Sequence, residues 1–282
     1  MIASAKSLAP IRTAVSVDLD DVGCYHAIHG LPPPSPEHAG VVLERCLPRF
    51  LELFNGCDVK ATFFVIGRDL QRDLDAQGRG AAALREVVAA GHELGNHSYA
   101  HAYDLTRWRP SQQRSDIERC HRMLSELGAD VVGFRAPGYT HDRQLLSVVS
   151  DLGYRYDSSA LPSPPYYAAK LAAMGAMRIL GRKSQSLASG AASFFGSRQP
   201  HRLPDLPLWE LPISVAGAMR WPLIGTTVLG QPGWLAAPLR REARKIRFLN
   251  LELHGLDLAD PDGDGYLKAL RRVQPELKTP LA

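Results

Sequence analysis

The chain has 282 residues, of which 45% are apolar and 22% are charged. This composition is that of an ordinary globular protein, and we expect residues 1–282 to form a single domain with one core. The formal net charge is only +4, and no run of Lys and Arg is long enough to indicate a nucleic-acid-binding tract. Nucleic acid is therefore excluded as an expected partner.

The N-terminal segment 1–13 lacks the apolar run that a signal peptide or a membrane span requires. We therefore expect a cytoplasmic protein. The four cysteines do not show the CxxC spacing of redox or zinc motifs, and a reducing compartment would keep them as free thiols that serve packing. They are Cys24, Cys46, Cys57 and Cys120.

The first predicted strand covers residues 14–19, AVSVDL, because β-branched residues dominate it and turn signals follow. Three carboxylates crowd its end: Asp18, Asp20 and Asp21. Carboxylates at this density repel each other unless a cation or a proton lies between them. The end of this strand is therefore a candidate functional site.

A second candidate is the pair His97 and His101, in the segment 91–101 with the sequence GHELGNHSYAH. Histidines four residues apart lie on one side of a helical turn, so both imidazoles would face the same point, as a divalent metal requires. Alone the pair is weak evidence, because solvated histidines also occur at this spacing.

The rest of the chain alternates predicted strands with predicted helices, which indicates a parallel sheet and, at this length, favours a barrel. Functional residues of such a barrel lie where strands end, and Arg135, Asp157 and His254 also fall there. The further strands are predicted over 60–67, 92–94, 131–134, 154–156, 208–215 and 247–253. The helices are predicted over 38–54, which Pro48 should disturb, and over 81–90, 111–127 and 142–152.

Residues 160–206 break this alternation and are predicted to be an insertion that contains a helix over 166–180. The preferred interpretation is that this helix packs on the barrel. The alternative is an interfacial helix that contacts a membrane through residues 166–183, or that holds a lipid-linked substrate. Such contact would make the protein membrane-peripheral. The sequence leaves the oligomeric state open.

Five separated motifs, in the right order, resemble those of the polysaccharide deacetylases, which are the family 4 carbohydrate esterases with a Nod-factor deacetylase-like domain. The likeness runs from about Val15 to His254. The first motif reads VDLDD where most members read TFDDG, and this departure is closer to the intracellular Asp-x-Asp branch. The motifs are the aspartate-rich strand end, HSYAH (97–101), RAPGY (135–139), YDS (156–158) and LELH (251–254).

The resemblance implies an α/β fold, a distorted (β/α)7 barrel with an inserted helical segment. It also implies a divalent metal held by Asp20, His97 and His101. Zinc is the expected ion, with Co, Ni, Fe or Mn as alternatives. Three protein ligands leave positions open for water and substrate, as in catalytic rather than structural sites.

On the pattern of this branch, Asp18 would be the general base and Asp20 the metal ligand. The adjacent-pair register would instead make Asp20 the base and Asp21 the ligand. We prefer the first assignment, because the departure from TFDDG marks the branch, although a bulge at a strand end shifts such a register easily.

His254 would protonate the leaving amine, with Arg135 and Asp157 orienting and tuning the acid and the base. The alternative for Arg135 and Asp157 is a structural ion pair. Gly138 and Tyr139 are the expected substrate-binding residues, with a backbone N–H of their loop directed at the oxyanion. Gly138 stands where the common Arg-x-Pro-Tyr motif has its tyrosine.

The expected function is the metal-dependent removal of an N-acetyl or N-formyl group from an amino sugar or a related intracellular or lipid-linked substrate. Two alternatives stay open. One is hydrolysis of a ureide or another non-sugar amide. The other is a catalytically silent barrel that binds a carbohydrate or a partner protein.

Overall fold

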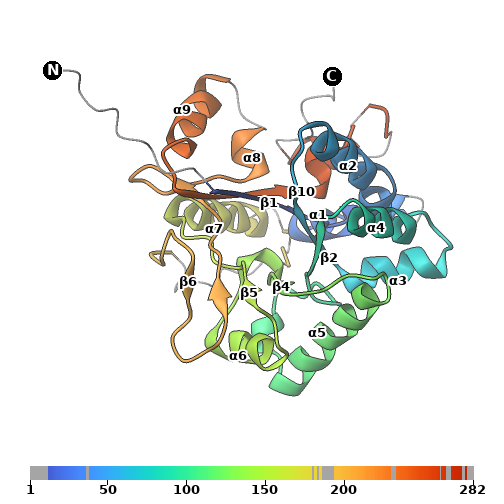
Figure 1. Ribbon diagram of the computed structural model, residues 1–282. Coiled ribbons are helices and arrows are strands. Elements are labelled where there is room, and N and C mark those ends of the chain that lie inside the picture. The colour runs from blue at the N-terminus through green and yellow to red at the C-terminus, as the bar shows by residue number, and fades with distance from the viewer. Residues whose placement is uncertain are drawn as a thin grey trace.

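The computed structural model describes residues 12–35, 38–179, 181–182, 184–185, 194–229, 233–260, 262–264, 268–274 and 277. Their architecture is an eight-stranded sheet that curls on itself, with helices along the outside of the curve (Figure 1). Seven neighbouring strands are parallel, and β6 pairs antiparallel with β7 at one edge. In spatial order the strands are β10 (Phe248–His254), β1 (Arg12–Asp18), β2 (Thr62–Val65), β3 (Glu93–Asn96), β4 (Gly133–Phe134), β5 (Tyr156–Asp157), β7 (Trp209–Glu210) and β6 (His201–Arg202).

The predicted fold class is confirmed: the protein is an α/β structure of the distorted (β/α)7-barrel type. The space between β7 and β10 is bridged by the segment that follows β7. The N–H of Ser214 donates to the carbonyl of Asn250 at 3.0 Å, and Ile224 forms a parallel bridge with Glu252. This segment also carries a small antiparallel hairpin of β8 (Val215–Ala216) and β9 (Trp221–Pro222).

The predicted helices are present within a few residues of their expected bounds, and two further helices, α1 and α3, follow directly after β1 and β2. The helices of the first half are α1 (Val22–Ile28), α2 (Leu47–Gly56), α3 (Gly67–Asp75), α4 (Gly80–Ala89), α5 (Pro110–Ser125) and α6 (Arg143–Asp151). Those of the second half are α7 (Pro164–Ile179), α8 (Gly225–Val228), α9 (Gly233–Ala243) and α10 (Lys268–Arg271). Short 3₁₀ segments are η3 (Leu105–Arg107), η4 (Pro137–Tyr139) and η6 (Gly255–Leu258).

Pro48 disturbs the second helical segment as the sequence predicts. The segment begins as a π-helix, η2 (Val42–Cys46), and changes to α2 at Leu47. Proline has no N–H to donate to the carbonyl four residues earlier, and its ring crowds that carbonyl. The chain therefore widens by one residue before Pro48, where the N–H of Leu47 donates to the carbonyl of Val42.

The single strand predicted over 208–215 is wrong. Only β7 joins the large sheet, and Val215 belongs to the separate hairpin. Pro212 lies between them and has no N–H for a strand ladder. The neighbouring residues continue with isolated bonds, in which the N–H of Leu211 donates to the carbonyl of Asp157 at 2.8 Å.

The region predicted as an insertion, 160–206, contains α7 and β6. Helix α7 is largely exposed, packs against β9, and buries only Tyr167 among its described side chains. Residues 180 and 183, which belong to the predicted membrane-contact segment, lie outside the described residues. Among the described residues, we find no helix with the length and apolar character needed to span a bilayer.

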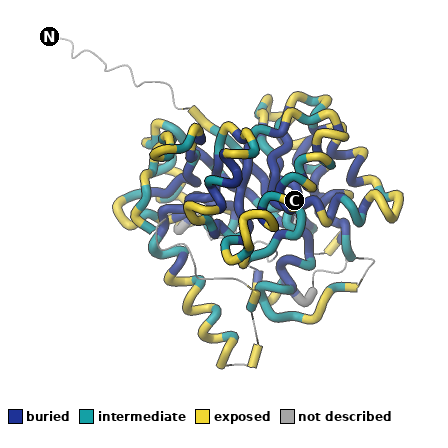
Figure 2. Tube along the Cα trace, turned by 90° about the horizontal axis from the view of Figure 1, so that it is seen from below, coloured by how far each residue is buried: buried dark blue, intermediate teal, exposed yellow. Residues whose placement is uncertain are grey.

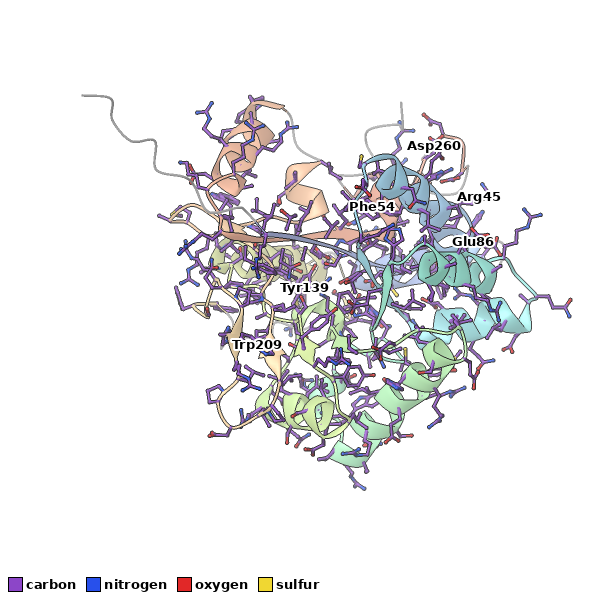
Figure 3. All side chains as sticks on the ribbon, viewed as in Figure 1. Arg45, Phe54, Glu86, Tyr139, Trp209 and Asp260 are labelled. Carbon is purple, nitrogen blue, oxygen red and sulfur yellow. The ribbon has the colours of Figure 1, made fainter. Side chains whose placement is uncertain are left out.

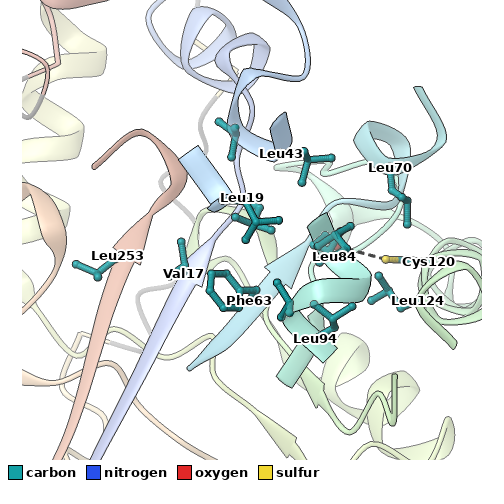
Figure 4. Close-up of a cluster of buried hydrophobic side chains, with 14 of the residues drawn as sticks. Val17, Leu19, Leu43, Phe63, Leu70, Leu84, Leu94, Cys120, Leu124 and Leu253 are labelled. Carbon is teal, nitrogen blue, oxygen red and sulfur yellow. Dashed lines mark hydrogen bonds between the residues drawn. The ribbon is translucent and has the colours of Figure 1, made fainter. Parts of the chain in front are cut away.

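The main core fills the space between the large sheet and the helices that follow β1 to β4. Figure 2 shows these buried positions in the middle of the molecule, with exposed ones on the outer helices and loops. Phe63 of β2 lies at the centre, with its ring centroid 6.4 Å from that of Phe50 and 6.0 Å from that of Phe54. Figure 4 shows Val17 and Leu94 beside it, on the neighbouring strands.

Replacing Phe63 by alanine should lower the free energy of unfolding by about 3–5 kcal/mol, because a fully buried ring is lost and a cavity remains. Urea denaturation followed by circular dichroism measures this change. Leu53→Ala is the control, since Leu53 lies on α2 with 45% of its surface exposed and should cost about 0.5 kcal/mol. Equal losses in the two variants would contradict the placement of Phe63.

Candidate active site

The carboxyl ends of the parallel strands surround a cavity of about 180 Å³. Strand β1 ends at Asp18 and β10 ends at His254, and these two residues are paired neighbours in the sheet. The other walls come from the turn after β3, the loop after β4 and the first turns of α1 and α7. The polar and aromatic residues that line the cavity include Asp18, Asp20, Cys24, Tyr25, His97, Tyr103, Tyr139, Tyr166, Lys170 and His254.

The turn that carries His97 and His101 is not helical, which corrects the geometry expected from their spacing. Ser98 and His101 have positive φ angles of 62° and 48°. The turn is held from within: the N–H of Ser98 donates to Asn96 Oδ1 at 2.8 Å, and the N–H of His101 donates to Ser98 Oγ at 2.9 Å. The two imidazoles still converge, with their ring centroids 4.9 Å apart.

Asp116 of α5 fixes the middle of this turn from outside. Its carboxylate accepts the N–H of Tyr99 at 2.8 Å and the N–H of Ala100 at 2.9 Å. Asn96 adds a second anchor, because its Nδ2 donates to the carbonyl of Ile117, also on α5, at 2.9 Å. The histidine turn is therefore positioned by the helix that follows it.

Asp20 lies between the two histidines. Its Oδ1 is 3.3 Å from His97 Nε2 and 3.3 Å from His101 Nε2. Both imidazoles are buried. Burial would raise the pKa of Asp20, but His101 and His97 outweigh this effect and hold that pKa well below its usual range. The carboxylate is thus charged where the two rings meet.

These three side chains fit a divalent cation. Within the described part of the chain, neither Asp20 Oδ1 nor His101 Nε2 makes a well-directed hydrogen bond, although both atoms are buried. Two ligands of a tetrahedral zinc ion lie about 3.3 Å apart, as these atoms do. Nδ1 of His97 bonds the carbonyl of Arg135 at 2.7 Å, which leaves Nε2 directed at Asp20.

Asp18 faces a different partner. Its Oδ1 accepts a hydrogen bond of 2.5 Å from Arg135 Nη1, and both side chains are buried. The guanidinium is held further by Ser16 Oγ and Ser158 Oγ, each at 2.9 Å, and it stacks on the ring of Phe64 at 4.2 Å. The other oxygen of Asp18 points toward the histidines, 3.7 Å from His97 Nε2.

Asp21 turns away from the cavity. Its Oδ2 accepts a hydrogen bond of 2.6 Å from Arg72 Nη2 on α3 and one of 3.3 Å from the N–H of Gly40. Thus the three carboxylates at the end of β1 have three environments. Asp18 meets an arginine inside the barrel, Asp20 meets the histidines, and Asp21 meets an arginine outside.

His254 and Glu252 lie on one face of β10, two residues apart. Nε2 of His254 is 3.2 Å from Glu252 Oε1, which also accepts a hydrogen bond of 2.9 Å from Tyr139 Oη. Figure 3 shows Tyr139 in the interior, below the β1–β10 pair. Its N–H donates to the carbonyl of Ala136 at 3.2 Å, so this amide is already engaged.

Asp157 is not brought into this group. Its carboxylate accepts bonds from the N–H and the hydroxyl of Ser159, at 3.0 and 2.7 Å. Burial and the adjacent Asp157 raise the pKa of Glu210 well above its ordinary value. Among the described residues, no hydrogen bond or ion pair joins Asp157 to Arg135 or to His254. The structural ion pair with Arg135, which was the alternative to a catalytic role, does not form, because Arg135 points across the barrel to Asp18.

Gly138 lines the cavity with a φ of +60°. A Cβ placed on this residue would lie 2.8 Å from the ring of Tyr103, so a side chain at this position would be obstructed. The glycine that replaces the common tyrosine therefore lets the loop approach Tyr103 closely.

Two residues at the site were missed in the sequence. Cys24 of α1 has its Sγ within 4.8 Å of ligand atoms of Asp20 and His101. Burial raises the pKa of its thiol well above the usual value, so it stays protonated. The other residue is Glu252. Strand alternation could have identified it, because residues i and i+2 share a face and His254 was already a candidate.

Comparison with known proteins finds a family that the chain resembles. The sequence model of the family described as polysaccharide deacetylase matches residues 39–156. The chain is therefore similar to the polysaccharide deacetylases over this region. Its matched part includes the histidine turn and the Arg135 loop, whereas Asp18, Asp20 and His254 lie outside it.

Two curated proteins to which the chain is similar are named for peptidoglycan. A peptidoglycan deacetylase-like protein of Gibberella zeae is 29% identical over 155 residues, which cover 53% of this chain and 44% of the relative. A peptidoglycan deacetylase of Helicobacter pylori is 25% identical over 161 residues, which cover 56% of this chain and 53% of the relative. The chain therefore spans about half the length of these relatives.

A solved structure shares the fold of this chain. The crystal structure of a putative polysaccharide deacetylase from Mycobacterium smegmatis matches with a TM-score of 0.58 and 20% identity. The match covers 87% of this chain and 77% of that one. The likeness supports the barrel described above.

The metal content of purified variants tests which residues bind the ion. We expect Asp20→Asn, His97→Ala and His101→Ala to lose most of the divalent metal that purified wild-type protein carries, because each removes a ligand. Asp21→Asn should keep the metal, since Asp21 bonds Arg72. Plasma mass spectrometry of the purified variants measures the content.

His201→Ala is the control for an unspecific effect of losing a histidine. It should keep the metal, because His201 lies on the edge strand β6. Retention of metal by Asp20→Asn together with its loss in Asp21→Asn would reverse the assignment of ligand and base.

Proposed function

We propose that this chain is a metal-dependent hydrolase that removes an N-acyl group, acetyl or formyl, from an amino sugar. The observation that carries the proposal is the meeting of three groups in one cavity. They are a candidate metal triad, a carboxylate held by a buried arginine, and a histidine paired with a carboxylate. The names of the two peptidoglycan relatives support an N-acetylated sugar as the substrate class.

Asp20, His97 and His101 would hold the metal, with zinc as our expected ion. When bound, a divalent ion polarises the carbonyl of the amide and makes a water molecule more acidic. Neutral imidazoles and an ionised carboxylate are the forms that bind metals. Burial lowers the pKa of His101, which favours the neutral form of that ring. Burial would also lower the pKa of His97, but Asp18 and Asp20 outweigh it and raise that pKa, so a metal would bind there in competition with a proton.

Asp18 is the general base in this proposal. One carboxylate oxygen is fixed by Arg135, and the other points into the cavity toward His97. An oxygen held in this way is placed to accept a proton from water that attacks the carbonyl. Gly138 offers the N–H of the loop as a donor to the oxyanion, because that of Tyr139 is engaged.

His254 is the general acid that donates a proton to the leaving amine. Burial alone would lower the pKa of His254, but Glu252 and Asp18 outweigh it and raise that pKa to about 9. The imidazole is therefore protonated at neutral pH, as an acid must be. Ligand atoms of Asp18, Glu252 and His254 lie within 4.8 Å of one another, so base and acid flank the same small volume.

The direct test is the release of acetate from N-acetylglucosamine oligomers, or of formate from N-formylated amino sugars, by purified protein. We expect turnover that stops with a chelator and returns with added zinc. Asp18→Asn should lower kcat by about 10²–10⁴-fold, the usual contribution of a general base, while keeping its metal. Full activity in Asp18→Asn, or in metal-free protein, would refute the proposal.

The pH dependence of the same reaction tests the partner of His254. The rate should fall as pH rises through the pKa of His254, because the acid loses its proton. Glu252→Gln removes a negative charge 3.2 Å from the ring, so the alkaline limb should move to lower pH by about one unit or more. Rate profiles of kcat/KM measure this shift.

Asp157→Asn separates the two candidate partners of His254. It should leave the alkaline limb in place, since the carboxylate of Asp157 bonds Ser159. The other groups around the ring are Asp18, Asp20 and Asp257, with Tyr139 and Tyr25, and they are unchanged in both variants. A shift in Asp157→Asn but not in Glu252→Gln would restore the pairing expected from the family.

A further inference from the structure

An apolar groove of about 430 Å³ lies beside the catalytic cavity. One wall is the face of α7 that carries Ala169, Ala173 and Met177, which are spaced four residues apart. The opposite wall is formed by the hairpin strand β9 and the start of α8. The apolar residues that line the groove are Ile28, Pro165, Tyr166, Ala169, Ala173, Met174, Met177, Trp221, Pro222 and Ile224.

The groove and the catalytic cavity are neighbours. Six residues line both of them, and we call this shared boundary the neck: Ile28, Tyr166, Lys170, Ile224, Thr226 and Gln274. Among the described residues at this neck, Lys170 is the only cation, and its Nζ donates to the carbonyl of Gly138 at 3.3 Å. A molecule whose polar end lies at Asp18 and His254 would therefore enter the groove with its other end.

The two spaces differ sharply in polarity. The catalytic cavity presents carboxylates and imidazoles, whereas most of the groove is alanine, methionine, proline and aromatic side chains. The polar side chains of the groove are His29, Lys170, Ser184, Thr226, Thr227 and Gln274. The apolar surface continues past Trp221, because a second cavity of about 420 Å³ shares Trp221 and Thr227 with the groove. Pro238 and Leu239 of α9 line this second cavity. Trp221 itself is 48% exposed.

We propose that the groove binds the aliphatic chain of an amphiphilic substrate whose N-acylated amino sugar occupies the catalytic cavity. This inference rests on the proposed function and names the substrate class more closely. A second sugar ring suits the wall of α7 poorly, because Ala169, Ala173 and Met177 offer its hydroxyl groups no side-chain partner, and hydroxyl groups buried without partners are costly. Methylene groups suit it well, since each one removed from water improves binding by up to about fourfold.

Chain length is the variable to test. Methyl, butyl and octyl β-glycosides of N-acetylglucosamine, each below its micelle concentration, serve as probes for the wild-type enzyme with its metal. We expect kcat/KM to rise with chain length, by about tenfold or more from methyl to octyl, which is well below the limit of about fourfold per methylene. Equal kcat/KM values for the three glycosides would overturn the inference.

A pair of variants on α7 locates the effect. Ala173→Trp should fill the groove and lower the ratio of kcat/KM for the octyl glycoside to kcat/KM for the methyl glycoside to about one. Ala172→Trp places the same ring on the same helix, at an exposed residue that does not line the groove, and should keep the ratio. If the ratio is the same in both variants as in the wild type, the chain binds elsewhere and the inference is wrong.

Binding measured without turnover separates this inference from the proposed function. Calorimetric titration of Asp18→Asn protein with the methyl and octyl glycosides should show tighter binding of the octyl compound. Tighter octyl binding, without hydrolysis of any glycoside by wild-type enzyme, would support the groove and refute hydrolysis of this sugar. Hydrolysis of all three glycosides with equal affinities would support the proposed function and refute the groove.

Discussion

The buried ion pair of Arg135 and Asp18 constrains the whole site. Removing a guanidinium from water costs several kcal/mol unless its N–H donors are paired inside the protein. Here Nε donates to the carbonyl of Ser158, Nη1 to Asp18, and Nη2 to the hydroxyls of Ser16 and Ser158. These bonds tie the ends of β1, β4 and β5 together across the barrel. Because Asp18 is committed to Arg135, Asp20 is the carboxylate left to face the histidines.

A second constraint is the left-handed backbone of the histidine turn. A non-glycine residue with positive φ costs about 1 kcal/mol or more and persists only where its surroundings fix it. Ser98 and His101 both have such angles. The turn is fixed by Asn96 from within and by Asp116 from α5. The side chains that would bind the ion are thus held in place by residues that do not touch it.

The sequence predicted those parts of the site that depend on local order along the chain. Asp18, Arg135 and His254 each follow an apolar run, and parallel strands bring such positions to one edge. The conformation of the histidine turn was not predictable from its own residues, since it depends on Asp116 on the next helix. The apolar groove was equally hidden, because its walls come from α1, α7 and β9, which are far apart in the chain.

The proposed acid and the proposed base differ in how far along the chain their partners lie. Asp18 is oriented by Arg135, which comes from across the barrel. His254 is oriented by Glu252, its neighbour on the same face of the same strand. The anion beside His254 favours an imidazolium, the form that can donate a proton to a leaving amine. The adjacent strands β1 and β10 bring the proposed base and the proposed acid together, with ligand atoms of Asp18, Glu252 and His254 within 4.8 Å of one another.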